Sequence, residues 1–164
     1  MRIPTRKPGK YTDQTRDPHM TQAKFDELKS QLARMLKARP AQTAEVKHLA
    51  EMGDFSENAA YQIAKGRLRG LNQRIMEIED HLKYAKIITP EKSSTVQLGS
   101  TVTIEQAGKQ QTFTILGPTE TNPAKGIISH KSPMGAALMG KRVGDVLRLT
   151  LGATEKTIRI LSVD

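Results

Sequence analysis

Residues 61–85 read YQIAKGRLRGLNQRIMEIEDHLKYA, and this stretch decides the fold of the N-terminal half. Its apolar positions are separated by three and four residues in strict alternation: Tyr61, Ala64, Leu68, Leu71, Ile75, Ile78, Leu82 and Ala85. Side chains at this spacing lie on one face of an α-helix, and a run of more than three heptads is typical of a coiled coil. We therefore predict a helix over residues 56–86, which would span roughly 45 Å at ~1.5 Å per residue.

The residues before this stretch carry a second, weaker heptad pattern, which begins after Thr21. Its positions are Phe25, Leu28, Leu32, Met35, Arg39, Gln42, Val46 and Leu49. The pattern loses its apolar character near Pro40 and resumes in phase beyond it. Since a proline inside a helix usually kinks it, the preserved phase favours one kinked or locally broken helix over two unrelated helices.

Between the two patterns lies the sequence Gly53-Asp54-Phe55-Ser56-Glu57-Asn58. So short a connection predicts that the helices pair antiparallel as a hairpin over residues 20–89, with the tip at 53–58. The tip then holds two carboxylates, Asp54 and Glu57, three residues apart and far from any core.

Two interpretations of these carboxylates stay open. Asp54 could be the N-cap of the second helix, with Glu57 completing a capping box. Alternatively, both could share a hard divalent cation such as Mg²⁺, which takes only one or two protein carboxylates and is otherwise held by water and phosphate oxygens. Two carboxylates alone would bind Mg²⁺ weakly, so a partner would have to complete such a site, as in two-metal phosphodiester hydrolysis.

From Val96 the apolar period changes to two, which indicates strands. We expect strands at 96–104, 112–116, 126–129, 146–151 and 156–163, and a short helix opened by Ser132-Pro133 and closed at Gly140. The predicted fold class is α+β: the helical hairpin, a linker at 90–95, and a small antiparallel sheet domain with a short helix at 96–164. Residues 1–19, rich in proline and basic side chains, are expected to form a flexible tail.

The composition narrows the possible functions. The chain has no cysteine, which excludes disulfides, thiolate metal sites and a cysteine nucleophile, and its histidines are scattered. No apolar run approaches a membrane span and the N-terminus has no secretory h-region, so we expect a cytoplasmic protein without membrane contact. The net charge of +9 favours an anionic partner, including DNA through general basic charge.

At the tip, residues 53–61 (GDFSENAAY) resemble the signature of the bacterial Gre transcript-cleavage factors, GreA and GreB. Further matching blocks are Arg39-Pro40, Ala85 to Ile88, Ser132-Pro133, Ala137 to Lys141 and Val143 to Asp145. The resemblance covers residues 20–164. The segment from Lys65 to Arg69 looks more like GreB, and the tip and the C-terminal segments look more like GreA, so the subtype stays open.

This resemblance implies a transcription elongation factor rather than an enzyme. The C-terminal domain would have an FKBP-like fold and dock at the secondary channel of RNA polymerase, and the coiled coil would enter that channel. Asp54 and Glu57, with Ser56 in a weaker supporting role, would then help the polymerase hold Mg²⁺ and the attacking water, so that the 3′ end of backtracked RNA is cleaved. The protein would have no cofactor of its own and would act as a monomer.

The resemblance also suggests contact residues. Basic side chains along the hairpin would meet the nascent RNA 3′ segment: Lys65 first, two helical turns from Asn58, with Arg67 and Arg69 as further candidates. Polymerase docking would involve Ser129, Ser132 and Pro133. Each set has a plain alternative, a solvated helix face for the first and turn and N-cap residues for the second.

Three other functions remain to be weighed. A Gre paralogue could occupy the same channel and inhibit the polymerase. A prolyl isomerase would suit an FKBP-like fold, but residues 90–164 contain one aromatic residue, Phe113, where such a pocket needs several. A coiled-coil adaptor that binds nucleic acid would make the acidic tip dispensable.

Overall fold

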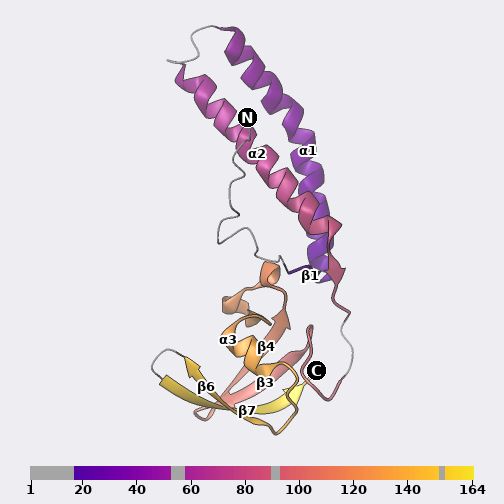
Figure 1. The fold of residues 1–164 in the computed structure, drawn as a ribbon, viewed down its shortest axis with the longest axis vertical. Helices are drawn as coiled ribbons and strands as arrows, with labels where there is room; N and C mark the ends of the chain where they lie inside the picture. Colours follow the sequence, from indigo (N-terminus) through magenta and orange to yellow (C-terminus); the bar gives the residue numbers. More distant parts are fainter. Residues whose placement is uncertain (1–16, 53–57, 90–92, 152–153) are drawn as a thin grey trace, which may run out of the picture.

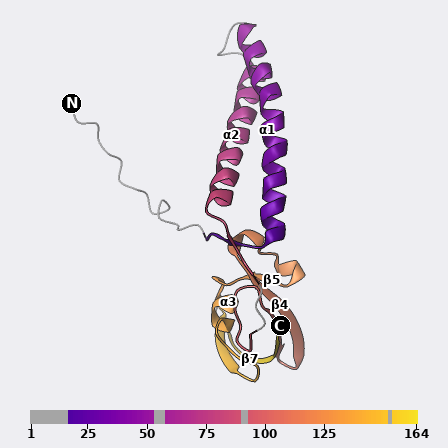
Figure 2. The same ribbon diagram turned by 90° about the vertical axis from the view of Figure 1, so that its right-hand side faces the viewer.

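The computed structural model describes residues 17–52, 58–89, 93–151 and 154–164. Figures 1 and 2 show an elongated molecule in which a long helical hairpin stands on a small sheet domain. This is the predicted α+β arrangement of a hairpin followed by a sheet with one short helix. None of the helices described is long and apolar enough to cross a membrane.

The hairpin consists of α1 (Gln22–Glu51) and α2 (Ala59–Lys83). Thr21 caps α1 by accepting a hydrogen bond from the Lys24 backbone N–H. The helix contains Pro40 and runs on through it, which confirms the prediction of one helix rather than two unrelated ones, although the helix is not broken at this proline. The predicted heptad positions of both helices are buried or half-buried, with the exception of Arg39, so the two patterns do form the contact between the helices.

The tail predicted for residues 1–19 includes residues that the structure places in the fold. Residues 1–16 lie outside the described part of the chain, but Asp17 to Met20 belong to the fold. The short strand β1 (His19–Met20) pairs in parallel with β2 (Lys86–Ile87), directly after α2. Met20 is fully buried. The segment that leads into α1 is therefore held beside the segment that follows α2.

The sheet domain contains five strands in the order β5-β4-β3-β7-β6. They are β3 (Thr101–Gln106), β4 (Lys109–Leu116), β5 (Ile127–Ser129), β6 (Val146–Leu151) and β7 (Thr154–Val163). The predicted turn is present between β3 and β4, where Ala107 and Gly108 both have positive φ, as a two-residue hairpin loop requires.

Two predictions about the sheet were wrong. The sheet is mixed rather than antiparallel, because β4 and β5 pair in parallel. Between them the chain makes two short 3₁₀ turns, η1 (Pro118–Glu120) and η2 (Pro123–Lys125). They bring it back beside Thr114, so that β5 pairs with the last three residues of β4. The first strand begins at Thr101 rather than Val96, since Gly99 turns the chain with a φ of 99°, although Val96 still enters the core.

The short helix α3 (Pro133–Leu138) covers the sheet, with Ser132 as N-cap and Pro133 in its first turn, as predicted. One cluster of buried side chains joins this helix to the strands. Its members are Val96, Val102, Ile104, Ile115, Ile128, Leu138, Ile158 and Ile160. The sheet domain therefore has a core of its own, separate from the contact between the two long helices.

Candidate functional site: the far end of the hairpin

The hairpin end that lies farthest from the sheet domain is formed by the C-terminus of α1 and the N-terminus of α2 (Figure 1). α1 ends at Glu51 and α2 begins at Ala59. The candidate acids Asp54 and Glu57 and the supporting Ser56 belong to the connection between these ends, and they lie outside the described residues. The described helices thus define where the acid-bearing connection is attached.

Asn58 is the N-cap of α2, so the predicted capping box of Asp54 and Glu57 is wrong. The Asn58 side-chain oxygen accepts the backbone N–H of Tyr61 at 3.0 Å. The sequence contained this signal, because asparagine before a helical run is among the strongest N-caps. With the cap supplied by Asn58, capping no longer accounts for the two acids in the preceding residues.

The same asparagine also reaches across to α1. Its amide nitrogen lies 3.5 Å from the Leu49 carbonyl oxygen, a long hydrogen bond in the last turn of that helix. One side chain therefore contacts the two helix ends between which the acidic residues are held. Sequence reasoning treated Asn58 only as part of a motif and missed this positioning role.

The three basic candidates on α2 do not share one surface. Lys65 and Arg69 line an open groove of about 960 Å³, and the described residues around it all belong to α2. Gly66 lies between them and leaves open space, since a Cβ at this position would meet nothing within 4 Å. Arg67 is exposed but does not line the groove.

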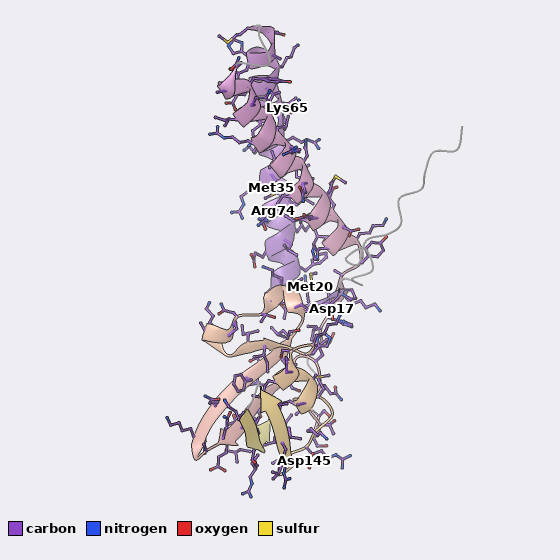
Figure 3. The ribbon with its side chains drawn as sticks, turned by 60° about the vertical axis from the view of Figure 1, so that its left-hand side comes forward. Asp17, Met20, Met35, Lys65, Arg74 and Asp145 are labelled. Atoms are coloured by element: carbon purple, nitrogen blue, oxygen red, sulfur yellow. The ribbon has the colours of Figure 1, made fainter. Side chains whose placement is uncertain are left out.

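Lys65 is held close to the hairpin end (Figure 3). Its ammonium nitrogen lies 5.5 Å from the centroid of the Tyr61 ring, within the range of a cation–π contact. Tyr61 is also the residue whose backbone N–H donates to the Asn58 side chain, so one residue contacts both the cap and the lysine. This arrangement places a positive charge close to the end of the hairpin.

In the sheet domain, the three predicted docking residues have defined structural roles. The Ser132 hydroxyl accepts the Gly135 N–H at 3.1 Å as the cap of α3 and donates to the Ser129 carbonyl at 2.6 Å. Ser129 is only 7% exposed and Pro133 is exposed. The turn and N-cap interpretation is therefore confirmed for the two serines, and of the three residues Pro133 offers the most surface to a partner.

No group of three or more histidine, cysteine or acidic side chains that could hold a metal ion occurs among the described residues. Asp54 and Glu57, the predicted ligands of a metal at the hairpin end, lie outside these described residues. Carboxylate oxygens are suitable ligands for Mg²⁺, but two of them leave most of its octahedral shell to water or a partner.

Comparison with known proteins agrees with this architecture. Residues 19–87 match the family described as "Transcription elongation factor, N-terminal", and residues 91–164 match "Transcription elongation factor, GreA/GreB, C-term". The chain is 35% identical over 150 residues to the transcription elongation factor GreA of Lactococcus lactis subsp. lactis, covering 88% of this chain and 96% of that protein. It is 37% identical over 148 residues to GreA of Thermomicrobium roseum, covering 88% and 95%.

Among solved structures, a similar chain is the GreA factor homolog 1 (Gfh1) of Thermus thermophilus. The sequence identity is 30%, the TM-score is 0.43, and the match covers 91% of this chain and 99% of the other. Factors of the GreA family are non-catalytic accessory factors of RNA polymerase. On the two family matches, which together span nearly all described residues, this chain belongs to the GreA/GreB family of transcription elongation factors.

Proposed function

We propose that this protein stimulates the cleavage of backtracked RNA by RNA polymerase, with its sheet domain docked outside the secondary channel and its hairpin inserted. The observation that carries the proposal is the arrangement of the hairpin. A long, stiff pair of helices ends in a connection that contains two carboxylates, and the cap of the following helix is supplied by a different residue, Asn58.

The role assigned to Asp54 and Glu57 is to complete a metal site in the polymerase. When bound between the two proteins, Mg²⁺ would neutralise charge on the scissile phosphate and lower the pKa of a bound water. The two carboxylates would supply hard oxygen ligands and orient that water by hydrogen bonding, with Ser56 as a further hydrogen-bonding group. Because two carboxylates alone bind Mg²⁺ weakly, the pair would be inert until the polymerase supplies the remaining ligands.

Lys65 and Arg69 are the basic residues we assign to the RNA 3′ segment, because they line the same groove along α2, in the part of it that lies nearer the hairpin end. Contacts between such side chains and phosphates position a nucleic acid without reading its sequence. Arg67, which lies outside the groove, is assigned a smaller contribution. In the sheet domain, Pro133 is the exposed member of the proposed docking surface, which Ser129 and Ser132 shape from behind.

The proposal is tested with stalled, backtracked polymerase complexes. Wild-type protein should accelerate Mg²⁺-dependent RNA cleavage, and Asp54→Asn or Glu57→Gln should reduce the rate by roughly 10²-fold, the lower end of what a positioned carboxylate contributes to activating water. Glu51→Gln is the matched control, because Glu51 is an exposed carboxylate in the last turn of α1.

Polymerase binding must be measured in the same samples. If the tip variants bind and cleave like the wild type, the proposed mechanism is wrong. If the wild type suppresses cleavage, the protein is an inhibitor that uses the same channel.

The RNA-contact assignment has its own test. Lys65→Glu and Arg69→Glu should slow cleavage mainly on RNA that is backtracked by several nucleotides, since only a longer 3′ segment would reach the groove. Arg67→Glu makes the same charge change two residues from either site and should have the smaller effect. Equal losses for all three variants, or equal losses at all RNA lengths, would rule out a contact specific to the groove.

A further inference from the structure

The segment directly before the hairpin, Asp17 to Thr21, lies between the hairpin and the sheet domain (Figures 1 and 3). On the hairpin side it is fixed by main-chain hydrogen bonds. The Lys86 N–H donates to the Pro18 carbonyl at 2.8 Å, and the Ile88 N–H donates to the Met20 carbonyl at 2.9 Å. The segment therefore moves with the base of the two long helices.

On the other side, the Asp17 carboxylate binds the sheet domain. One of its oxygens lies 2.9 Å from His130 Nε2 and 3.1 Å from Lys131 Nζ, in the loop between β5 and α3. The other oxygen accepts the His19 N–H at 3.0 Å and lies 2.8 Å from the His19 ring Nδ1. The carboxylate is only 5% exposed, so these partners replace nearly all of its water.

The ionisation of Asp17 fits this environment. Burial by itself would raise its pKa, but hydrogen bonds from the His19 backbone and ring and from Lys131, together with the charge of His130, lower the pKa to about 2. The carboxylate is therefore charged at neutral pH. Of its partners in the sheet domain, His130 is the more buried, whereas the Lys131 side chain is half exposed, so water weakens the pair with Lys131 more than the pair with His130.

Two further contacts join the segment from Asp17 to Thr21 to the sheet domain; we call this contact region the junction. The Thr21 backbone N–H and hydroxyl both donate to the Glu120 carboxylate, which belongs to η1 of the sheet domain. Gly117, just before η1, lies so close to the segment that a Cβ there would be 2.1 Å from the His19 carbonyl oxygen. The entry of the hairpin is thus in close polar contact with two separate loops of the sheet domain.

We infer that Asp17 is a positioning residue that holds the hairpin in one orientation on the sheet domain. The helices amplify any motion at this point: at ~1.5 Å per residue α1 is about 45 Å long, so a rotation of ~10° at its base displaces the far end by about 8 Å. Asp17 lies just before the region that matches the N-terminal family model, which starts at residue 19, while its partners His130 and Lys131 lie within the C-terminal match. Only the consequence of this contact for cleavage rests on the proposed function.

The chain contains no cysteine, so pairs of spin labels can be introduced without background. Lys37→Cys on α1 with Gln110→Cys on β4 reports the distance between hairpin and sheet domain. Lys37→Cys with Met76→Cys on α2 reports the hairpin alone, and all of these positions are exposed. Asp17→Asn keeps the shape of the side chain and removes its charge, while Asp26→Asn removes a carboxylate from α1, outside the junction, as the matched control.

Asp17→Asn should broaden the hairpin-to-sheet distance distribution at least twofold, as should Glu120→Gln to a smaller extent. The distribution within the hairpin should keep its wild-type width, and Asp26→Asn should change neither. In the His130→Gln background, Asp17→Asn should broaden the distribution less than it does in the wild type, because the contact with His130 is already lost and only the one with Lys131 still joins Asp17 to the sheet domain.

An unchanged hairpin-to-sheet distribution in Asp17→Asn would overturn the inference, and so would equal broadening of both label pairs, which would show general loosening. These measurements need no polymerase, so they separate this inference from the proposed cleavage role. If the distances respond as expected while the tip variants remain active in cleavage, the positioning contact stands and the cleavage mechanism fails.

Discussion

The hairpin and the sheet domain bury their apolar side chains in different ways. No side chain of α1 is buried, and on α2 only Ala64, Ile75 and Ile78 are. The sheet domain instead gathers eight buried aliphatic side chains into one cluster. The hairpin is therefore held by many half-buried contacts along a line, and the sheet domain by a few fully buried ones at a centre.

Because of this difference, we expect the stability of the protein to depend mainly on the sheet domain and its activity mainly on the hairpin. A half-buried side chain removes less apolar area from water than a fully buried one, so each hairpin contact contributes a smaller free energy. The hairpin also leaves large apolar side chains of α2 exposed, such as Ile63 and Met76. It extends farther from the sheet domain than a compact domain of the same size could. We expect substitutions in the sheet domain to change folding and substitutions near the hairpin end to change activity.

The largest expected effect is a core truncation in the sheet domain. Ile160 is 1% exposed and pairs across the sheet with Ile104, so Ile160→Ala leaves a cavity and should lower the free energy of unfolding by about 2–5 kcal/mol. Leu32→Ala on the half-buried face of α1 should cost less than half as much, because its surroundings are open to water. Denaturation of both variants by urea gives the comparison, and equal losses would contradict it.

The same contrast between hairpin and sheet domain explains which parts of the fold could be predicted from the sequence. The heptads identified both long helices and their shared face, because a pattern of local spacing is enough to define a helical hairpin. The parallel pairing of β4 with β5 was missed, because it depends on where the chain returns after two short 3₁₀ turns. Spacing along the sequence does not encode such a return.

Among the candidate functional residues, those related by local spacing were predicted, and those brought together only by folding were not. Lys65 and Arg69 fall on one face of α2 by helical periodicity, which the sequence shows. Asp17 was placed in a tail, because its partners His130 and Lys131 lie more than a hundred residues away and only the folded chain brings them to it. Asn58 was overlooked because two acids nearby offered an equally plausible cap.

The second prediction, with a smaller expected effect, concerns the contribution of Asp17 to the free energy of unfolding at acid pH. The pKa of Asp17 is lowered from 3.8 to about 2 in the folded protein, so its stabilising contribution is complete above the unfolded value and is lost as the pH falls towards the folded one. At ~1.4 kcal/mol per pKa unit this amounts to about 2 kcal/mol. The difference in unfolding free energy between wild type and Asp17→Asn should therefore shrink over this range.

Urea denaturation at several pH values between about 5 and about 2, the range in which carboxylates titrate, measures this difference. Asp26→Asn, a change on α1 outside the junction, should remain parallel to the wild type throughout. A gap between wild type and Asp17→Asn that is the same at every pH would mean that the charge of Asp17 contributes nothing to folding.

A third effect lies at the opposite end of the hairpin. Asn58→Ala removes the cap of α2 and should cost about 1 kcal/mol. Asn58→Asp keeps an oxygen for the Tyr61 N–H and loses the donor to the Leu49 carbonyl, so it should cost less. Helical circular dichroism during urea denaturation measures both. If Asn58→Asp is as stable as the wild type but slower in RNA cleavage, the contact with α1 positions the acidic residues rather than stabilising the hairpin.

The smallest effect has the opposite sign and uses two glycines inside α2. A Cβ added at Gly66 or Gly70 would meet no atom within 4 Å, so alanine fits at either position and should stabilise the hairpin by about 0.5–1 kcal/mol through its higher helix propensity. Gly66 lines the groove beside Lys65 and Gly70 does not. Both variants should therefore raise the urea midpoint alike, but only Gly66→Ala should change the cleavage of long backtracked RNA. If Gly70→Ala changes cleavage equally, the stiffness of the helix, and not the groove, governs the contact with RNA.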